Sequence, residues 1–589
     1  MVIHPTASNR AVVGTVLVAS LVFSSFVRLR LRELPLERDD GEYAYAGQLI
    51  LKGIPPYRLA YNMKLPGTYL AYAGLMALFG ESAAGIHVGL LLVNLLTILL
   101  IFFLGRDLFE STAGAAAAVV YSVSSVSATV FGMAAHATHF VALFGVAGTW
   151  LLWKAIGRGS ARTLFAAGLL LGTAFVMKQQ GLFLPAFGAV AVVGHFGRSQ
   201  PFSAGRLLTL MAVFMAGTVV PFSATCLWLW VAGVFDRFWL WTFDYARQYV
   251  VEQTLEQGAA MFWHQIRASA AANWPFWVAA ILGAAGLALG SGGRERNRFV
   301  YAFFFGSFLC VCPGLYFREH YFIVLLPAIA LLAGAGCNAV ARFIGRAMAP
   351  GGLFHRQQPS KRRSASNPDS VGKSRRGVGR PAGGHRFPLD GIPARRERAF
   401  PADAVAAAIL VVAVACAIWP QRGVFFFWTP GETCRAVYGA NPFVESVPIA
   451  DYLRSHSTPD DRVAVVGSEP QIYFLSRRTS ATGYIYTYPL MEPQPFARRM
   501  QEDMAREIEA SRPALVVLVN VPASWLAKPG SDPFIYEWAE RFVRAEYEPA
   551  GLVDILSQER TEYHWGREAA GARPRSPIHV WILRRKSES

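Results

Sequence analysis

The stretch Ala84-Gly-Ile-His-Val-Gly-Leu-Leu-Leu-Val-Asn-Leu-Leu-Thr-Ile-Leu-Leu-Ile-Phe-Phe-Leu104 decides the fold class of this chain. It carries no Asp, Glu, Lys or Arg, and it has the roughly 20 apolar residues that a helix needs to cross a bilayer. Ten further apolar runs resemble it, so we expect a polytopic α-helical membrane protein with about eleven spans. The other runs cover residues 11–29, 112–131, 137–153, 163–178, 180–196, 207–232, 273–290, 299–316, 320–341 and 402–420.

The composition excludes soluble, fibrous and disordered proteins. Of the 589 residues, 53% are hydrophobic and only 16% are charged, whereas a soluble domain carries about 25% charged residues. The formal net charge of +17 comes largely from one segment, because residues 342–398 hold 14 Lys and Arg against three acidic residues. The charge is therefore not spread as a nucleic-acid-binding surface, and we expect no nucleic-acid partner.

The charges between the apolar runs predict the orientation. Loops rich in Lys and Arg stay in the cytoplasm, and four such gaps fall on the side of the N-terminus when eleven spans are counted. We therefore expect the first loop, 30–83, and the tail from 421 outside the cytoplasm. Arg28, Arg30 and Arg32 oppose this assignment, and we expect them to contact lipid phosphate. The four basic gaps lie near 154–162, 198–206, 294–298 and 342–402.

The chain divides into four segments. Residues 1–346 are the transmembrane module, 347–401 a basic linker, 402–420 the last span, and 421–589 a C-terminal α/β domain that is periplasmic or extracellular. The linker consists largely of Gly, Pro, Ser and Arg without apolar periodicity, which predicts disorder. It is either a solvated insert or a segment attracted to anionic lipid.

The tail shows the pattern of a small α/β domain. Two apolar runs, 462–467 and 514–519, predict buried strands, and 579–583 predicts a strand that closes the sheet. Amphipathic stretches alternate with these runs, which favours parallel strands with covering helices. The amphipathic stretches cover residues 443–455, 495–511 and 532–545.

The most informative stretch is the loop after the first apolar run. Its apolar residues recur at helical spacing, which predicts an amphipathic helix lying on the membrane surface. Asp39 and Asp40 fall at the N-terminus of this helix, where carboxylates are favoured. On chemistry alone, the acidic pair is a helix cap. The apolar stripe consists of Tyr43, Ala46, Ile50 and Leu51.

The same loop resembles the first outer loop of C-type glycosyltransferases, in particular protein O-mannosyltransferases and lipid A aminoarabinose transferases. Members of that family carry an acidic pair, Gly-x-Tyr, Gly-x-x-Pro-Tyr and Lys-x-Pro-Gly in this order. Here the third element is one residue longer. Segments 177–181, 316–321 and 467–473 are also similar, so the resemblance covers most of the chain outside the linker. The tail resembles the outer domain of bacterial members, which implies a location in the inner membrane of a bacterium. The four elements are Asp39-Asp40, Gly41-Glu42-Tyr43, Gly53-Ile-Pro-Pro-Tyr57 and Lys64-Leu-Pro-Gly67.

This resemblance implies a chemistry. A sugar moves from a polyprenyl-phosphate carrier in the membrane lipid to an acceptor of unknown class. The acceptor loses a proton to a carboxylate, and the leaving phosphate needs cations. Direct displacement inverts the anomeric carbon and needs neither a cofactor nor a metal if Lys and Arg neutralise the phosphate. The implied base is Asp39, with Asp40 second, either to orient the acceptor or as the base itself. The other implied residues are Lys64, Lys178, Arg318 and His320 at the donor phosphate, and Tyr43, Tyr57 and Tyr69 as substrate contacts.

Plainer explanations stand beside these assignments. Long cationic side chains at membrane boundaries also reach toward headgroups, and interfacial aromatic belts explain tyrosines equally well. His136 and His139 have a spacing that supports metal binding, but the sequence offers no third ligand, so we expect no metal site. The aromatic segment 235–257 predicts a surface-lying cover over the donor.

The alternative function is a membrane transporter or lipid flippase. Its mark would be ionisable residues within the spans, and the apolar runs contain almost none. A membrane scaffold whose tail binds a partner is a third possibility, but it has no need for the acidic pair together with Lys64.

Overall fold

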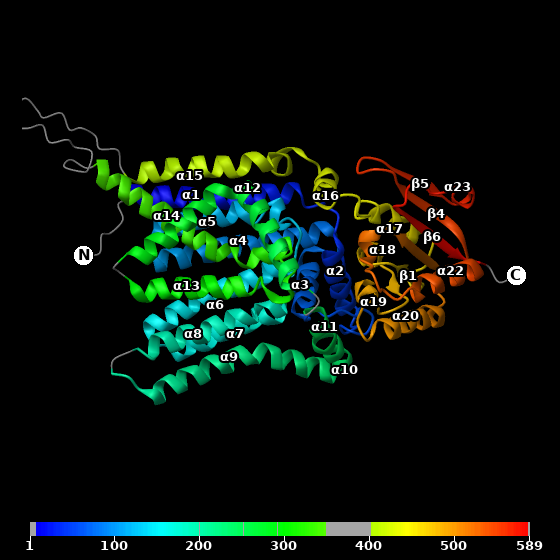
Figure 1. Cartoon of the computed structure of the whole chain (residues 1–589), viewed down its shortest axis with the longest axis horizontal. Helices are drawn as coiled ribbons and strands as arrows, with labels where there is room; N and C mark the ends of the chain where they lie inside the picture. The colour runs from blue at the N-terminus through cyan, green and yellow to red at the C-terminus, as the bar shows by residue number, and fades with distance from the viewer. Residues whose placement is uncertain (1–6, 199–200, 251–252, 291–292, 349–401, 587–589) are drawn as a thin grey trace, which may run out of the picture.

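The computed structural model describes residues 7–198, 201–250, 253–290, 293–348 and 402–586 (Figure 1). Long helices form a bundle, and a sheet-containing domain follows at one end of it, so that the first and the last described residues lie at opposite ends. The fold expected from the sequence, a polytopic helical protein with a C-terminal α/β domain, is confirmed. From residue 349 onward, the predicted linker 347–401 lies outside the described residues.

Each of the eleven apolar runs coincides with a helix of the bundle. Six of the described helices, α1, α4, α6, α9, α12 and α14, are long and apolar enough to cross a membrane by length and composition. The number of spans therefore remains a prediction. The bundle helices are α1 (Ala7–Arg30), α4 (Ala83–Leu108), α5 (Ser111–Ser124), α6 (Ala137–Arg158), α7 (Ala161–Met177), α8 (Phe183–Phe196), α9 (Ala204–Val231), α12 (Leu255–Leu289), α13 (Arg294–Leu309), α14 (Leu326–Met348) and α15 (Ala402–Ile418).

Local chemistry sets the helix limits. The Ser82 hydroxyl accepts a hydrogen bond from the Gly85 amide and caps α4, which satisfies one of the free amides at the helix start. Helix α5 ends at Ser124, earlier than the apolar run 112–131 predicts. The serines at this end form hydrogen bonds of their own, and the Ser127 hydroxyl donates to the side-chain oxygen of Gln421. Helix α12 begins before the predicted 273, with a kink at Asn273 just ahead of Pro275, where proline cannot continue the helical hydrogen bonding.

The apolar stripe predicted that the first-loop helix lies on the membrane surface, and this prediction is wrong. Helix α2 (Arg38–Leu51) is buried on nearly all sides from Arg38 to Leu49. It lies between the bundle and the C-terminal domain, with α3 (Gly67–Phe79) packed along it (Figure 1). The other short helices at this end are η1 (Ala128–Val130), η2 (Gln179–Leu182), α10 (Phe235–Trp239), η3 (Leu240–Tyr245), α11 (Ala246–Val250), η4 (Pro313–Leu315) and η5 (Glu319–Val324).

Two of the three arginines after the first run, Arg28 and Arg30, bond to the protein's own backbone, where contact with lipid phosphate was expected. For Arg32, whose side chain is exposed, that contact stays a prediction. Arg28 is buried and donates to the carbonyl oxygens of Ser125 and Gly132 at 3.1 and 3.0 Å. The Arg30 guanidinium donates to the carbonyl of Phe425 at 3.0 Å. These backbone oxygens at helix ends have no helical partner, so the two arginines satisfy them instead.

The C-terminal domain is built on a six-stranded sheet of order β2-β1-β3-β6-β4-β5. Strands β2, β1 and β3 are parallel, as predicted, but β6, β4 and β5 are antiparallel. The predicted third strand therefore lies inside the sheet and not at its edge. Strand β6 pairs with β3 on one side and with β4 on the other, and β4 continues through a hairpin into the edge strand β5. The strands are β1 (Arg462–Val466), β2 (Thr479–Ser480), β3 (Leu515–Asn520), β4 (Tyr547–Ile555), β5 (Thr561–Trp565) and β6 (His579–Arg585).

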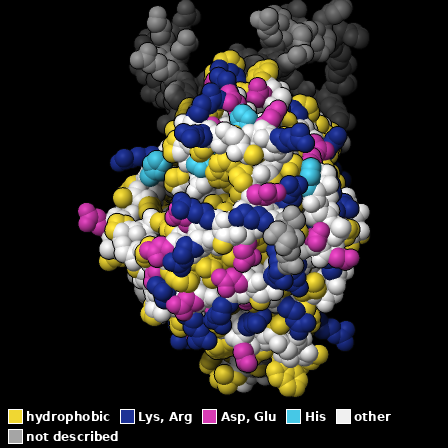
Figure 2. Space-filling view, turned by 90° about the vertical axis from the view of Figure 1, so that its right-hand side faces the viewer, with side chains coloured by type: hydrophobic (Ala, Val, Ile, Leu, Met, Phe, Trp, Pro, Cys, Tyr) yellow, Lys and Arg dark blue, Asp and Glu magenta, His cyan; other side chains and the backbone are white. Residues whose placement is uncertain are grey.

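Helices cover the sheet where the amphipathic stretches predicted them. Lys and Arg alternate with Asp and Glu over the outer face of this domain (Figure 2), as expected for a surface in water. The helices and helical turns of this part are η6 (Trp419–Gln421), η7 (Gly423–Phe427), α16 (Pro430–Tyr438), α17 (Ser446–Ser455), α18 (Gln471–Ser476), α19 (Tyr488–Met491), α20 (Ala497–Ser511), α21 (Pro522–Trp525), α22 (Phe534–Glu546) and α23 (Arg567–Gly571).

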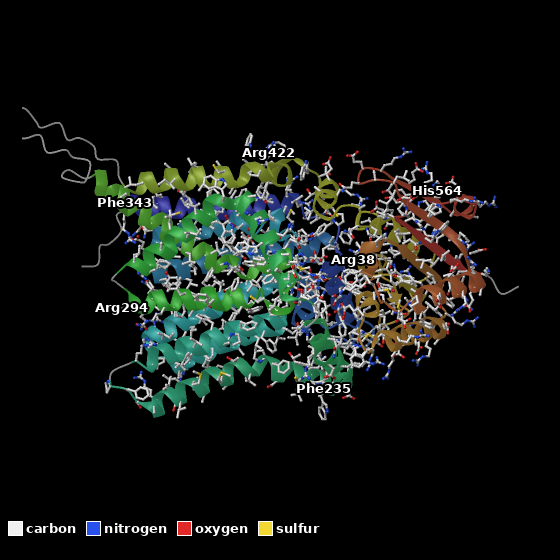
Figure 3. All side chains as sticks on the ribbon, in the orientation of Figure 1. Arg38, Phe235, Arg294, Phe343, Arg422 and His564 are labelled. Atoms are coloured by element: carbon white, nitrogen blue, oxygen red, sulfur yellow. The ribbon has the colours of Figure 1, made fainter. Side chains whose placement is uncertain are left out.

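One buried ion pair ties the domain to helix α2. The Arg38 side chain, labelled at the junction in Figure 3, donates to Glu469 Oε1 at 3.1 Å and to the Ser468 carbonyl at 2.9 Å. Both side chains are buried, with 8% and 0% of their surface exposed. A Cβ at Gly41 would lie 2.6 Å from the backbone nitrogen of Gln471, so α2 and α18 touch backbone to backbone. The C-terminal domain therefore packs directly against the first loop, through a buried ion pair and a close backbone contact.

Candidate active site

A cavity of about 870 Å³ opens at this junction. Its walls come from the start of α2, from the turns that join bundle helices, and from the C-terminal domain. Described residues of the segment 235–257 contribute to one wall, and its role as a cover over the donor stays a prediction. Ligand sites in proteins are commonly concave and mainly apolar, with a few polar groups. Polar side chains in the walls include Asp39, Lys64, His136, Lys178, Arg318, His320 and Tyr486.

Asp39 and Lys64 meet at this cavity. Lys64 Nζ donates to Asp39 Oδ1 at 2.7 Å and to Glu42 Oε2 at 2.6 Å. From the C-terminal domain, the Tyr486 hydroxyl also donates to Asp39 Oδ1, at 3.0 Å. Oδ2 of Asp39 forms no hydrogen bond with the described residues and lies 3.9 Å from His320 Nε2. One oxygen of this carboxylate is therefore held, and the other has free lone pairs.

The charges of this pair follow from its surroundings. Burial opposes ionisation of Asp39, but attraction to Lys64 outweighs it and holds the pKa of the carboxyl well below its usual range. Burial likewise opposes the Lys64 charge, yet Asp39 and Glu42 raise the pKa of the ammonium. Burial raises the pKa of Glu42. Near neutral pH, Asp39 is thus a carboxylate and Lys64 an ammonium.

Lys178 and Arg318 line the same cavity without an ion pair among the described residues. Lys178 Nζ lies 4.1 Å from the ring centre of Tyr321, and the Arg318 guanidinium lies 5.4 Å from that of Tyr316. Burial lowers the pKa of Lys178 to about 7, because the charged form lacks a direct counterion. Lys178 is thus only partly protonated near neutral pH, and an anion in this space would stabilise its charged form together with the Arg318 guanidinium.

Asp40 does not share the cavity with Asp39. Its carboxylate is 1% exposed and accepts hydrogen bonds from the Tyr72 hydroxyl at 2.9 Å and the Ala135 amide at 3.0 Å. Adjacent residues of a helix point about 100° apart, which turns Asp40 into the bundle when Asp39 faces the cavity. The sequence-based assignment of Asp40 as a second candidate base is therefore not supported by its position.

The three tyrosines predicted as substrate contacts also lie behind the cavity wall. Tyr43 places its ring 4.6 Å from Lys64 Nζ. The Tyr57 hydroxyl donates to the Lys64 carbonyl at 2.6 Å, and Tyr69 donates to Glu42. All three are buried. They surround Lys64 and Glu42, so their position is that of supports for the Asp39–Lys64 pair and not of groups that touch a bound molecule.

Two residues near Asp39 escaped the sequence reasoning. Glu42 stands in the quoted Gly-Glu-Tyr element, which could have drawn attention to it, but the motif alone gives it no role. Tyr486 has no signature in the sequence around it and reaches Asp39 from 447 positions away. Its contact arises only when the C-terminal domain is seated on α2.

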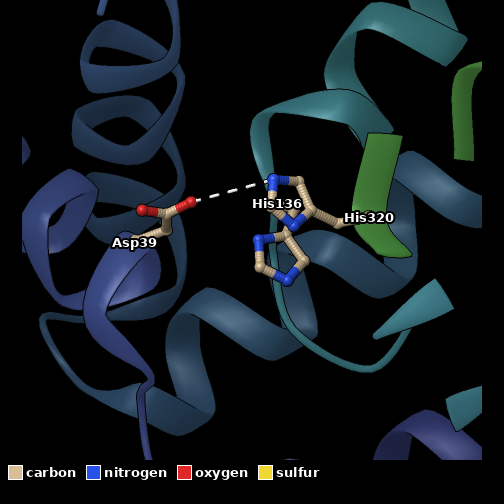
Figure 4. A group of neighbouring side chains, drawn as sticks. All are labelled: Asp39, His136 and His320. Carbon is tan, nitrogen blue, oxygen red and sulfur yellow. Dashed lines mark ion pairs between the residues drawn. The ribbon is translucent and has the colours of Figure 1, made fainter. Parts of the chain in front are cut away.

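His136 and His320 stack against each other beside Asp39 (Figure 4), with ring centres 4.2 Å apart and an angle of 15° between the rings. Burial lowers the pKa of both imidazoles below the usual value. His139, the other histidine of the sequence pair, turns into the bundle, where its ring lies 3.2 Å from the Gly132 carbonyl.

Comparison with known proteins agrees with this architecture. Residues 64–231 match the family described as dolichyl-phosphate-mannose-protein mannosyltransferase. A search of curated proteins finds no match. Among solved structures, ArnT from Cupriavidus metallidurans bound to undecaprenyl phosphate is similar, with a TM-score of 0.57, 14% identity and 98% of each chain covered.

A second similar structure is the archaeal oligosaccharyltransferase AglB from Archaeoglobus fulgidus, in complex with an inhibitory peptide and a dolichol-phosphate. Its TM-score is 0.51 at 12% identity, with 95% of this chain and 75% of that chain covered. At such low identity these likenesses concern the fold. They extend over the bundle and the C-terminal domain together.

Proposed function

The chain has the fold of the C-type membrane glycosyltransferases, and from this premise we propose that it transfers a sugar from a polyprenyl-phosphate donor to an acceptor, without a metal and with inversion. The observation that carries the proposal is the cavity, where the Asp39 carboxylate shares one space with Lys178 and Arg318 at the end of apolar helices. A lipid carrier can keep its chain in the membrane there and present its head to these groups.

The proposed reaction uses Asp39 Oδ2 as general base. It takes the proton of an acceptor hydroxyl or amine while the acceptor atom attacks the anomeric carbon. A bond from the acceptor to that carbon forms, the bond from the carbon to the phosphate oxygen breaks, and the phosphate leaves with the electron pair. Because the acceptor attacks opposite to the leaving group, the anomeric configuration inverts.

Lys178 and Arg318 are proposed to bind the donor phosphate. Both face the cavity without an ion pair among the described residues. A bound phosphate would keep Lys178 protonated beside the Arg318 guanidinium, and preorganised cations stabilise the charge that grows on a leaving phosphate. Lys64 and His320 remain predicted phosphate ligands. Lys64 also pairs with the carboxylates of Asp39 and Glu42, and we propose that it orients Asp39 in this way.

The proposed location is the inner membrane of a bacterium, with the cavity and C-terminal domain on the outer side. Arg294, in one of the basic gaps, is labelled at the end of the bundle opposite to Arg38 (Figure 3). Because basic loops stay in the cytoplasm, the Arg38 end with its cavity is the outer end.

Mass spectrometry of co-purifying lipid tests the function. We expect the wild-type protein to carry a polyprenyl phosphate or its sugar-linked form, and the doubly substituted K178M/R318M protein to carry far less. Recovery of equal amounts from both proteins would contradict the phosphate site. Absence of any isoprenoid phosphate, combined with no transfer to any acceptor, would contradict the function itself.

Removal of either cation should weaken donor binding. Lys178→Met and Arg318→Met are each expected to raise the Kd for a polyprenyl phosphate about tenfold or more, since a hydrogen bond to a charged group contributes about 1.5–3 kcal/mol. The matched control is Lys154→Met, because Lys154 lies in a basic gap at the other end of the bundle. Binding measured in detergent should be unchanged in the control; equal losses in all three variants would argue for a non-specific effect.

The Tyr486 hydroxyl should matter through Asp39. Tyr486→Phe removes one donor to the carboxylate, and we expect kcat to fall about tenfold while the KM for the donor stays the same. Tyr488→Phe is the control, because this neighbouring tyrosine also lines the cavity but donates to the Ala523 carbonyl. If the two variants behave alike in steady-state kinetics, the contact between Tyr486 and Asp39 has no part in transfer.

A further inference from the structure

A second, much smaller cavity lies inside the helix bundle. Its walls come from the end of α1, from α4 and from the turn that precedes α6, and it has room for a single ion or water molecule. It is separate from the active-site cavity, because the two share no wall residue. The wall side chains, all of them buried, are Val27, Arg28, Leu31, His87 and Met133.

Arg28 brings a permanent positive charge to this small cavity. The residue is 4% exposed, and a guanidinium stays protonated in proteins. Nη2 donates to the carbonyl oxygens of Ser125 and Gly132 at 3.1 and 3.0 Å. The N–H groups on Nε and Nη1 have no acceptor within the described part of the chain. Because buried donors nearly always have a partner, these groups indicate a ligand that accepts hydrogen bonds.

The charge of Arg28 also lacks a direct counter-charge. Two neutral carbonyls share its hydrogen bonds, and no carboxylate of the described residues forms an ion pair with it. The carboxylate of Asp40, which lies beside His87, is already hydrogen-bonded to Tyr72 and to the Ala135 amide. An uncompensated charge is costly inside a protein, so an anion next to Arg28 would stabilise the folded chain.

The rest of the wall selects a small anion. Nδ1 of His87 lies 2.8 Å from the Arg32 carbonyl and carries the proton of that contact. Nε2 has no hydrogen-bond partner among the described residues and lies 3.9 Å from Asp40 Oδ2. If Nε2 also carries a proton, the ring can donate to an anion while Asp40 balances its charge. The other walls are apolar, so they offer no donors to the several oxygens of a phosphate or sulfate.

We propose that this cavity binds one anion of the chloride class, which is the counter-ion of Arg28. The anion joins α1, α4 and the turn that contains Met133. This turn leads to Ala135, whose amide holds Asp40 in place. Occupancy therefore stabilises the packing behind the start of α2. The site does not depend on the proposed sugar transfer, since its wall residues take no part in that reaction.

Melting of the purified full chain in sodium chloride and in sodium gluconate, at equal ionic strength, tests the site. Gluconate is too large for the cavity, so chloride should raise the melting temperature, and the gain should grow with the logarithm of the chloride concentration once the site fills. Arg28→Met removes the charge and should abolish this difference. Arg30→Met is the matched control, because Arg30 also donates to a backbone carbonyl but lies outside the cavity wall. It should keep the full effect of chloride.

Bromide gives a direct readout that needs no variant. Crystals of the wild-type chain grown in sodium bromide should show an anomalous difference peak between Arg28 and His87. This peak, together with loss of the chloride effect in Arg28→Met alone, supports the proposal. Density at this position without anomalous signal would mean a water molecule and would overturn it. A chloride effect of equal size in Arg28→Met and Arg30→Met would overturn it as well. If Arg28→Met does not fold, the bromide peak decides.

Discussion

The Asp39→Asn protein is expected to lose between about 100-fold and 10,000-fold of its transfer rate, because a positioned general base contributes about this much. An amide has the shape of the carboxylate but cannot take the acceptor proton. Donor binding should remain within a few-fold of wild type, since Lys178 and Arg318 are untouched. Single-turnover transfer and polyprenyl phosphate binding, measured on the same preparation, separate the two effects.

Asp40→Asn is the matched control for this experiment. Asp40 accepts hydrogen bonds from Tyr72 and Ala135 inside the bundle, so its substitution should lower the melting temperature while transfer per folded molecule stays within a few-fold. If Asp40→Asn abolishes transfer in folded protein and Asp39→Asn does not, the assignment of the base to Asp39 is wrong.

The second large effect is expected at the ion pair between helix α2 and the C-terminal domain. Glu469→Gln leaves the buried Arg38 guanidinium without its counter-charge, and breaking a buried pair in this way costs about 3–5 kcal/mol. We expect a strongly lowered melting temperature and a loss of transfer, since the domain also holds Tyr486 at Asp39.

An exposed pair of the same domain gives the control for this prediction. Arg584 and Glu548 lie 2.8 Å apart with 58% and 46% of their side chains exposed, and such pairs contribute about 0–1 kcal/mol. Arg584→Gln should therefore melt close to wild type in a thermal-shift assay. A Glu469→Gln protein that melts and reacts like Arg584→Gln would show that the domain is not tied to the site through Arg38.

The sequence was a good guide to the bundle because apolar length is a local property. Each apolar run became a helix, and the misplaced limits have local causes. The run 112–131 contains serines that end helix α5 early. In the tail, the hairpin strand β4 was missed because Pro549 and Gly551 interrupt its pattern, and the structure shows a shift in register at these residues. Proline and glycine both weaken the signal of a strand.

The candidate site was only half visible in the sequence. Asp39 and Lys64 were found because a motif holds them close together in one loop, and the structure joins their side chains. The periodicity of apolar residues could not show where α2 lies. A helix buried between two domains has few polar residues, so its sequence resembles that of a helix at a membrane surface. Contacts such as Tyr486 to Asp39, or His136 to His320, join distant segments. No local pattern reports them, since they depend on how the elements pack.

The most direct test of the central claim is an electron cryo-microscopy map of the protein with bound polyprenyl phosphate. The claim is that one cavity holds the donor phosphate and the base together. We predict phosphate density within hydrogen-bonding distance of Lys178 and Arg318, with the Asp39 carboxylate facing the position of the anomeric carbon. Phosphate density outside this cavity, with Asp39 turned away from it, would contradict the claim.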